Sequence, residues 1–250
     1  VKIHTPTLAT HTWTSYADWA YESVPQERIS NNKIYTPIGK TLGGSSSINA
    51  MIYMRGSAYD YDSWEKLGNK NWGWKDVLPY FKKSENNKDN RNPEYHGNNG
   101  PWKIENGKIS NTDQIMMEAL SKKLNIPINE DVNGDKYQFN TFDGKRHSLA
   151  EAFLTKEVLQ RKNLFVQVNT EAIKILIEKR KVNNSNTNVA VGVQVINKNT
   201  IRDIFANNEV ILSSGAIKSP QILLLSGIGD ENDLKKHNID VIYNNKEVGK

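Results

Sequence analysis

Residues 37–51 read Pro37-Ile38-Gly39-Lys40-Thr41-Leu42-Gly43-Gly44-Ser45-Ser46-Ser47-Ile48-Asn49-Ala50-Met51. The adjacent glycines Gly43 and Gly44 permit positive φ angles and a close approach of the backbone to a neighbouring group. Three serines then offer hydroxyls and backbone N–H groups to a polar ligand. The mainly apolar run 48–54 anchors the stretch to a core, which a flexible Gly/Ser linker would lack. These residues alone predict either a backbone cradle for a flat or anionic ligand or an ordinary tight turn into a helix.

The composition is that of a folded protein. The chain has 250 residues, of which 37% are hydrophobic and 24% are charged, and its net charge is +5. This excludes the disordered class and predicts one large or two small domains. The basic residues form no run interleaved with aromatics, so no nucleic-acid partner is expected. No stretch of about 20 apolar residues occurs, so no membrane span is expected.

Several chemical motifs are absent from the sequence. There is no cysteine, which excludes disulfides and thiolate catalysis within this span, and the five histidines show no metal-ligand spacing, so no metal site is predicted. Gly39-Lys40-Thr41 resembles the end of a phosphate-binding P-loop, but that motif requires a glycine where Ile34 stands. Neither a G-x-S-x-G elbow nor a G-x-G-x-x-G fingerprint occurs.

Capping signals predict helices in the first two thirds of the chain. Residues 57–60 begin a helix that ends at Gly68, and residues 77–81 form a second short helix. Residues 83–100 are rich in asparagine and are expected to be loop.

Two further helices follow. Asn111 and Gln114 form a capping pair before an apolar stripe that is expected in the core, and Ser148 with Glu151 opens a helix to about residue 162. The stripe consists of Met116, Ala119, Leu120 and Leu124.

The last third alternates apolar and polar residues as strands do. Half-buried strands are expected at 164–168, 173–177 and 189–195, the last two joined through a turn at 182–186. Residues 210–212 are continuously apolar, which is typical of a strand buried on both faces of a parallel sheet.

A helix is expected after this buried strand, with Ser219 at its N-cap, Pro220 in its first turn and Gly227 closing it. A strand, a small-residue turn and a helix in this order place a ligand at the carboxyl edge of an open α/β sheet, or form a plain βα unit.

Two long stretches together resemble the glucose-methanol-choline (GMC) flavin oxidoreductases, and most closely their insect glucose-dehydrogenase branch. The first runs from Gly39 to Asn49 and continues through residues 51–56 and 60–64. The second reads Gly215-Ala216-Ile217-Lys218-Ser219-Pro220-Gln221-Ile222-Leu223-Leu224-Leu225-Ser226-Gly227-Ile228-Gly229.

The resemblance implies an α/β fold in which an FAD-binding domain is assembled from separated segments and a substrate domain is inserted between them. Residues 1–38 and 146–250 would belong to the FAD-binding domain, with its nucleotide-binding sheet and antiparallel meander. Residues 39–58 would form the loop that covers the flavin, and residues 59–145 the substrate-domain segment. The fold within this chain would be incomplete.

The resemblance also assigns cofactor-binding roles. Gly43, Gly44 and Ser45 would form the backbone cradle near the FAD diphosphate and ring. Ala172 stands where the family usually has a valine whose backbone meets the adenine, and Ser214 and Gly215 would lie beside the ADP part. The segment along the isoalloxazine would be Asn49, Ala50, Met51 and Ile52. Some members bind FAD covalently through a histidine just before the asparagine; here that residue is Ile48, so non-covalent FAD is expected.

The implied activity is oxidation of a CH–OH group in a small alcohol or sugar, with hydride transfer to the flavin. The family's G-x-G-x-x-G would precede Val1 and its catalytic histidine would follow Lys250, so we assign no catalytic residue here and expect an internal fragment of a longer enzyme. The isolated fragment is expected to bind FAD weakly. The alternative is a truncated or degenerate homologue with a binding or structural role. Neither the substrate nor the electron acceptor can be read from these residues, and the resemblance is compatible with an extracellular parent protein.

Overall fold

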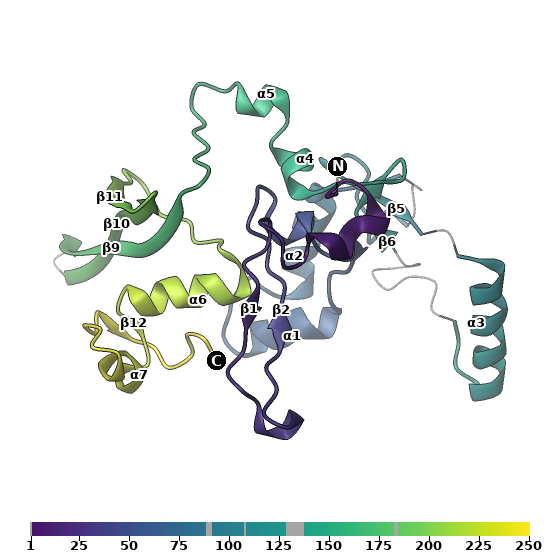
Figure 1. The fold of residues 1–250 in the computed structure, drawn as a ribbon, viewed down its shortest axis with the longest axis horizontal. Helices are drawn as coiled ribbons and strands as arrows, with labels where there is room; N and C mark the ends of the chain where they lie inside the picture. Colours follow the sequence, from purple (N-terminus) through teal and green to yellow (C-terminus); the bar gives the residue numbers. More distant parts are fainter. Residues whose placement is uncertain (1, 89–91, 108, 129–137, 183–184) are drawn as a thin grey trace. The chain divides into compact units, whose positions relative to one another are not determined.

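The computed structural model describes residues 2–88, 92–107, 109–128, 138–182 and 185–250, drawn in Figure 1. These residues form two compact units, Val1–Phe165 and Val166–Lys250. Both units contain helices and strands. Among the described residues, no helix combines the length and apolarity that crossing a membrane requires.

The first unit begins with short elements that lead into residues 37–51, which we call the glycine–serine stretch. β1 and β2 pair antiparallel, with Tyr21 opposite Thr36. The stretch itself contains a 3₁₀ turn, η3, and continues into β3. The bounds are η1 Pro6–Thr12, β1 Tyr21–Glu22, η2 Glu27–Ile29, β2 Tyr35–Thr36, η3 Gly44–Ser47 and β3 Ile52–Tyr53.

The buried carboxylate of Asp18 holds this N-terminal segment together. It accepts hydrogen bonds at 2.9 Å from the backbone N–H groups of Thr14, Ala20 and Ile38, and a further bond from the Tyr35 hydroxyl. Burial raises the pKa of Asp18, but these hydrogen bonds together hold it below the usual value. One side chain therefore fixes the path by which the chain enters the stretch at residue 37.

The buried guanidinium of Arg146 fixes the stretch by hydrogen bonds to its backbone and to the Asn49 side chain. Arg146 is 1% exposed and is the last residue of β8 (Lys145–Arg146), which pairs with β7 (Thr141–Phe142). Its Nε donates to the Ile3 carbonyl at 2.8 Å, and one terminal nitrogen donates to the Ser46 carbonyl at 3.0 Å and to Asn49 Oδ1 at 2.6 Å. The other terminal nitrogen donates to the Asn49 carbonyl at 2.8 Å. Arg146 thus joins the N-terminal residue Ile3, η3 and Asn49.

Helices α1 and α2 follow the stretch. The predicted start of α1 is confirmed, because Ser57 and Asp60 form a reciprocal capping box. α2 begins at Trp74, three residues earlier than predicted. Its cap is tertiary, since Asp62 of α1 accepts the backbone N–H of Trp74 at 2.9 Å. The bounds are α1 Ala58–Lys66 and α2 Trp74–Ser84.

The prediction of a loop over residues 83–100 is wrong in part. α2 continues to Ser84, and β4 pairs in parallel with β5 at one edge of a four-stranded sheet ordered β3-β6-β5-β4. The core of this sheet includes the fully buried Ile104. The polar sequence forms a strand because the Glu85 side chain finds buried partners. The bounds are β4 Glu85–Asn87, β5 Trp102–Asn106, β6 Gln138–Phe139, β7 Thr141–Phe142 and β8 Lys145–Arg146.

The other helices of the first unit correct three predictions. Ser110, not Asn111, caps α3, since its hydroxyl accepts the Asp113 N–H at 3.2 Å. The apolar stripe of α3 is exposed among the described residues rather than buried. The helix from residue 148 breaks at Leu154, and Thr155 caps a second helix. The bounds are α3 Asn111–Leu124, α4 Leu149–Phe153 and α5 Lys156–Leu159.

The second unit is built on an antiparallel meander ordered β11-β10-β9, with α6 lying along it (Figure 1). The predicted hairpin is confirmed by the pairing of Ser185 with Val182, while residues 183–184 of its turn lie outside the described residues. Ile175 donates its backbone N–H to the Ser226 hydroxyl at 2.8 Å, which joins β9 to the end of α6. The bounds are β9 Glu171–Val182, β10 Ser185–Asn197, β11 Thr200–Phe205, α6 Gly215–Leu225, β12 Ile228–Gly229, α7 Glu231–Lys236 and β13 Tyr243–Asn244.

Two predicted strands are absent among the described residues. Residues 164–168 and 210–212 have extended or irregular backbone without ladder partners. Alternation and apolar character favour a strand only where a neighbouring strand completes its hydrogen bonds.

The start of α6 is also corrected. Ser214 is at its N-cap and Pro220 lies in its interior, while the Ser219 hydroxyl accepts the Ser214 N–H at 2.9 Å. Gly227, with φ 81°, closes the helix as predicted.

Replacing Arg146 tests its role as the support of the stretch. Arg146→Met leaves several buried carbonyls without a donor, so we expect the free energy of unfolding to fall by about 3 kcal/mol. All six tryptophans lie in the first unit, so urea unfolding followed by tryptophan fluorescence reports on it. Arg28→Met, at an exposed arginine of η2 in the same unit, is the control and should change stability by less than about 0.5 kcal/mol. Equal losses in the two variants would contradict the role.

Replacing Asp18 tests whether its carboxylate stabilises the N-terminal segment, because that stabilisation should depend on pH. The pKa of Asp18 is lower in the folded state, so its stabilisation is complete above the unfolded value of about 3.9 and is lost as the pH falls through the folded pKa. We expect Asp18→Asn to lower stability by about 1–3 kcal/mol near neutral pH. The gap to the wild type should close in acid below about pH 4. Asp143→Asn, in the exposed β7–β8 turn, is the control; a gap independent of pH would refute the prediction.

Candidate functional site

The glycine–serine stretch has an outer face that remains open. At Gly44, whose φ is 54°, an added Cβ would meet no atom within 4 Å. Ala50 is exposed, and no hydrogen bond within the described residues uses its backbone N–H. Ser45 is exposed beside them, although its hydroxyl accepts the Gly39 N–H at 3.1 Å. This face therefore presents backbone and little side-chain bulk.

The inner face is closed by the other serines. The Ser46 hydroxyl donates to the Gly43 carbonyl at 2.6 Å, and the Ser47 hydroxyl donates to the Leu42 carbonyl at 2.8 Å. An added Cβ at Gly39 would lie 2.2 Å from the Gly44 carbonyl group, so the two ends of the turn touch through glycine. These two serines hold the loop in shape instead of offering their hydroxyls to a ligand.

Asn49 also faces inward. Its Oδ1 accepts hydrogen bonds from Arg146 at 2.6 Å and from the Met51 N–H at 3.0 Å. Met51 is buried with φ 66°, an uncommon left-handed conformation for a residue with a side chain. The Asn49 side chain stabilises this bend, which turns the chain into β3 at Ile52. Asn49 is thus a positioning residue for the backbone at Ala50 and Met51.

Asn140 lies directly beside this bend. Its backbone N–H donates to the Met51 carbonyl at 2.9 Å, and its side chain is 1% exposed. Neither amide atom of that side chain has a hydrogen-bond partner among the described residues. Leaving a buried amide unpaired is unfavourable by about 1–3 kcal/mol, and such groups are rare in native structures.

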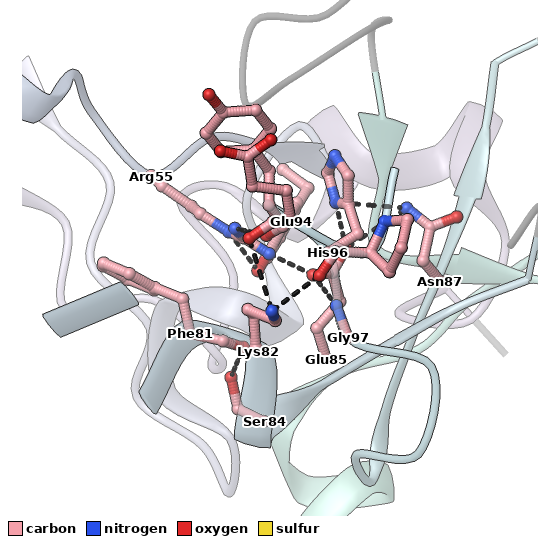
Figure 2. Close-up of polar contacts among 12 residues, drawn as sticks. Arg55, Phe81, Lys82, Ser84, Glu85, Asn87, Glu94, His96 and Gly97 are labelled. Carbon is pink, nitrogen blue, oxygen red and sulfur yellow. Dashed lines mark hydrogen bonds and ion pairs between the residues drawn. The ribbon is translucent and has the colours of Figure 1, made fainter. Parts of the chain in front are cut away.

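A fully buried ionic cluster holds the segment that follows the stretch (Figure 2). Glu85 pairs with Arg55, and its Oε1 lies 2.9 Å from His96 Nδ1. Its other oxygen accepts the Gly97 N–H at 3.1 Å. Arg55 donates to the Tyr53 hydroxyl at 3.1 Å, and burial raises the pKa of that tyrosine.

The cluster fixes the segment after the stretch to β4. Removing one partner of such a pair leaves an uncompensated buried charge, so the three side chains specify one arrangement of the chain.

The remaining predicted residues lie in the second unit. Ala172 is half-buried at the start of β9, opposite Val195. Ser214 and Gly215 are exposed at the N-terminus of α6, and Gly215 has φ 90° with no atom within 4 Å of an added Cβ. The other seven predicted cofactor residues all lie within 43–52 of the first unit. Ala172, Ser214 and Gly215 belong instead to the second unit.

Sequence reasoning missed the residues that support the loop. Arg146 stands two residues before the capping serine Ser148, and nothing in its local pattern distinguishes it from a surface arginine. Glu85 and His96 lie in the asparagine-rich segment 83–100, which the sequence predicts to be loop. Only the tertiary fold shows that these charged side chains are buried.

Comparison with known proteins gives a consistent result. The family model described as GMC oxidoreductase matches residues 7–250. The alcohol dehydrogenase [acceptor] of Pseudomonas putida is 39% identical over 241 residues, covering 93% of this chain and 42% of that protein. The mitochondrial choline dehydrogenase of Mus musculus is 37% identical over 255 residues, covering 99% and 41%.

Solved structures agree with the fold. Pyridoxine 4-oxidase from Mesorbium loti superposes with a TM-score of 0.84 at 27% identity, covering 97% of this chain and 47% of that one. A formate oxidase gives 0.83 at 27% identity, covering 100% and 44%. The α/β fold class is confirmed, and the chain spans less than half the length of these relatives. Because the family model covers nearly every residue and the sequence relatives align along more than nine tenths of it, the chain belongs to the GMC oxidoreductase family.

Proposed function

We propose that this chain is part of an FAD-dependent oxidoreductase that oxidises a CH–OH group of a small alcohol or sugar by hydride transfer to the flavin. The observation that carries the proposal is the open outer face of the loop, where Gly44 leaves space and the Ala50 N–H is unpaired among the described residues. Since the chain spans less than half of its relatives, the activity belongs to a longer protein.

The residues on this face fit a flat, electron-rich cofactor. Gly43, Gly44 and Ser45 would hold the diphosphate and ring edge. Gly44 leaves open space beside the backbone, whereas Gly43 allows the loop to pack closely against Ser47 and Ala150. The fixed N–H at Ala50 would stabilise negative charge on the ring system. When bound, FAD would accept the hydride from the substrate. Asn49, Met51 and Ile52 would orient this backbone, and Ala172, Ser214 and Gly215 would complete the cofactor site.

The substrate class rests on the relatives. The Pseudomonas putida and Mus musculus proteins are named alcohol and choline dehydrogenases, which supports a small alcohol. We further propose that the substrate can be a sugar and that the chain belongs to the insect glucose-dehydrogenase-like branch. Both proposals rest on the sequence resemblance. We also propose the division into FAD-binding segments 1–38 and 146–250, a flavin-covering loop 39–58 and a substrate-domain segment 59–145.

The proposed FAD is non-covalent. Ile48 occupies the position that precedes Asn49, and its side chain is buried and has no nucleophilic atom. FAD modification is described for the formate oxidase of Aspergillus oryzae, a structural neighbour, so the mode of attachment would distinguish this chain from that protein.

Acid denaturation of the longer protein tests the mode of attachment. Because residue 48 offers no nucleophile, we expect all flavin in the supernatant after precipitation. Flavin absorbance that stays with the washed polypeptide would contradict non-covalent binding.

Substitution at Gly44 tests the cradle. In the longer protein, Gly44→Leu places a side chain in the open face, and we expect the FAD bound per polypeptide to fall at least about ten-fold. Gly144→Leu is the matched control, since Gly144 also has positive φ and no atom within 4 Å of an added Cβ, but lies in the β7–β8 turn. It should retain FAD. Equal losses would indicate backbone strain and not a cofactor contact.

The function itself is tested by anaerobic mixing of the wild-type longer protein with small alcohols and sugars. Bleaching of the flavin absorbance is the expected result. A purified protein without flavin would favour the degenerate, non-catalytic alternative.

A further inference from the structure

The turn between α1 and α2 exposes large apolar side chains. Leu67 is 82% exposed, Trp72 is 54% exposed and Trp64 is 45% exposed. The rings of Trp64 and Trp72 lie 6.1 Å apart between centroids, so these two form one patch. We call residues 64–75 the tryptophan turn.

Backbone hydrogen bonds make the tryptophan turn a defined structure. The Trp64 carbonyl accepts the backbone N–H of Asn69 at 3.2 Å and its side-chain amide at 3.0 Å. The Trp72 N–H donates to the Asn69 carbonyl at 3.2 Å, and Gly68 takes a φ of 103°. The backbone that carries the apolar side chains therefore follows one defined path before any partner binds, which lowers the entropic cost of binding.

The turn is also basic. It carries three lysines and one acidic residue, Glu65, for a net charge of +2. Glu65 is half-buried, with its carboxylate turned toward Gly73. The lysines Lys66, Lys70 and Lys75 are exposed, and none forms an ion pair within the part of the chain that the structure describes.

This combination fits a lipid surface better than a protein partner. Lysine is depleted from the centre of protein interfaces, yet Lys66 and Lys70 stand between the apolar residues of the turn. At a bilayer surface, tryptophan occupies the headgroup level and lysine extends its ammonium to anionic phosphates while its stem stays in apolar surroundings.

We propose that the tryptophan turn is a peripheral membrane contact for anionic lipid. Leu67 and Trp72 enter the boundary between headgroups and acyl chains, and the three lysines bind the anionic headgroups. This inference is independent of the proposed oxidoreductase activity, because no residue of the turn belongs to the proposed cofactor site.

Vesicle flotation of the full chain tests the contact. We expect binding to vesicles of phosphatidylcholine with about one third phosphatidylserine, weakened by salt, and little binding to phosphatidylcholine alone. Replacing Lys66, Lys70 and Lys75 by glutamine should lower the partition coefficient about 100-fold, since each lysine contributes about five-fold. Leu67→Ser with Trp72→Ser should lower it at least about ten-fold.

A matched control comes from α3, which also exposes apolar residues near lysines. Met116→Ser with Leu120→Ser should bind the anionic vesicles like the wild type, and circular dichroism should show that every variant is folded. The proposal is overturned if the wild type ignores anionic vesicles, or if the α3 variant loses binding and the turn variants do not. It is also overturned if the turn variants change only self-association.

Discussion

The arrangement of the first unit depends on one buried guanidinium. Arg146 donates to the carbonyls of Ile3, Ser46 and Asn49 and to the Asn49 side chain, so it joins segments that are about a hundred residues apart in sequence. Carbonyls of a loop are the acceptors that secondary structure leaves unpaired, and a planar donor fork can satisfy several of them at once. The loop keeps a conformation rich in left-handed residues because this donor satisfies it from within.

The second arginine of the site solves a different problem. Arg55 is buried against Glu85, which also contacts His96, so charge compensates charge. Arg146 meets no carboxylate at hydrogen-bond distance among the described residues and is compensated by carbonyl dipoles, with Glu151 exerting a weaker field. One arginine therefore fixes the shape of the loop, and the other attaches the end of the loop to the β-sheet. With the loop fixed in this way, the outer backbone face at Gly44 and Ala50 stays open.

Local patterns predicted the parts of the fold that local interactions determine. The capping boxes at Ser57 and Ser148 and the β9–β10 hairpin are set by residues close in sequence, and all three are present. The failures share a different cause. The segments 164–168 and 210–212 and the stripe of α3 all require neighbours that the described residues do not supply. Burial of a charged residue such as Glu85 is likewise decided by tertiary partners, so an asparagine-rich segment could not reveal it.

The loop shows why residue identity and ligand contact need not coincide. The side chains that form hydrogen bonds within the protein are those of Ser46, Ser47 and Asn49. The groups that stay open are the backbone at Gly44 and Ala50. These polar residues therefore set the conformation of their neighbours. The outer face is in turn defined by what is missing, namely a side chain at Gly44 and a bulky one at Ala50. In the proposed cofactor site, the backbone would recognise the shape and charge of the ligand, and the inner-face residues would act on it by setting the conformation of the loop.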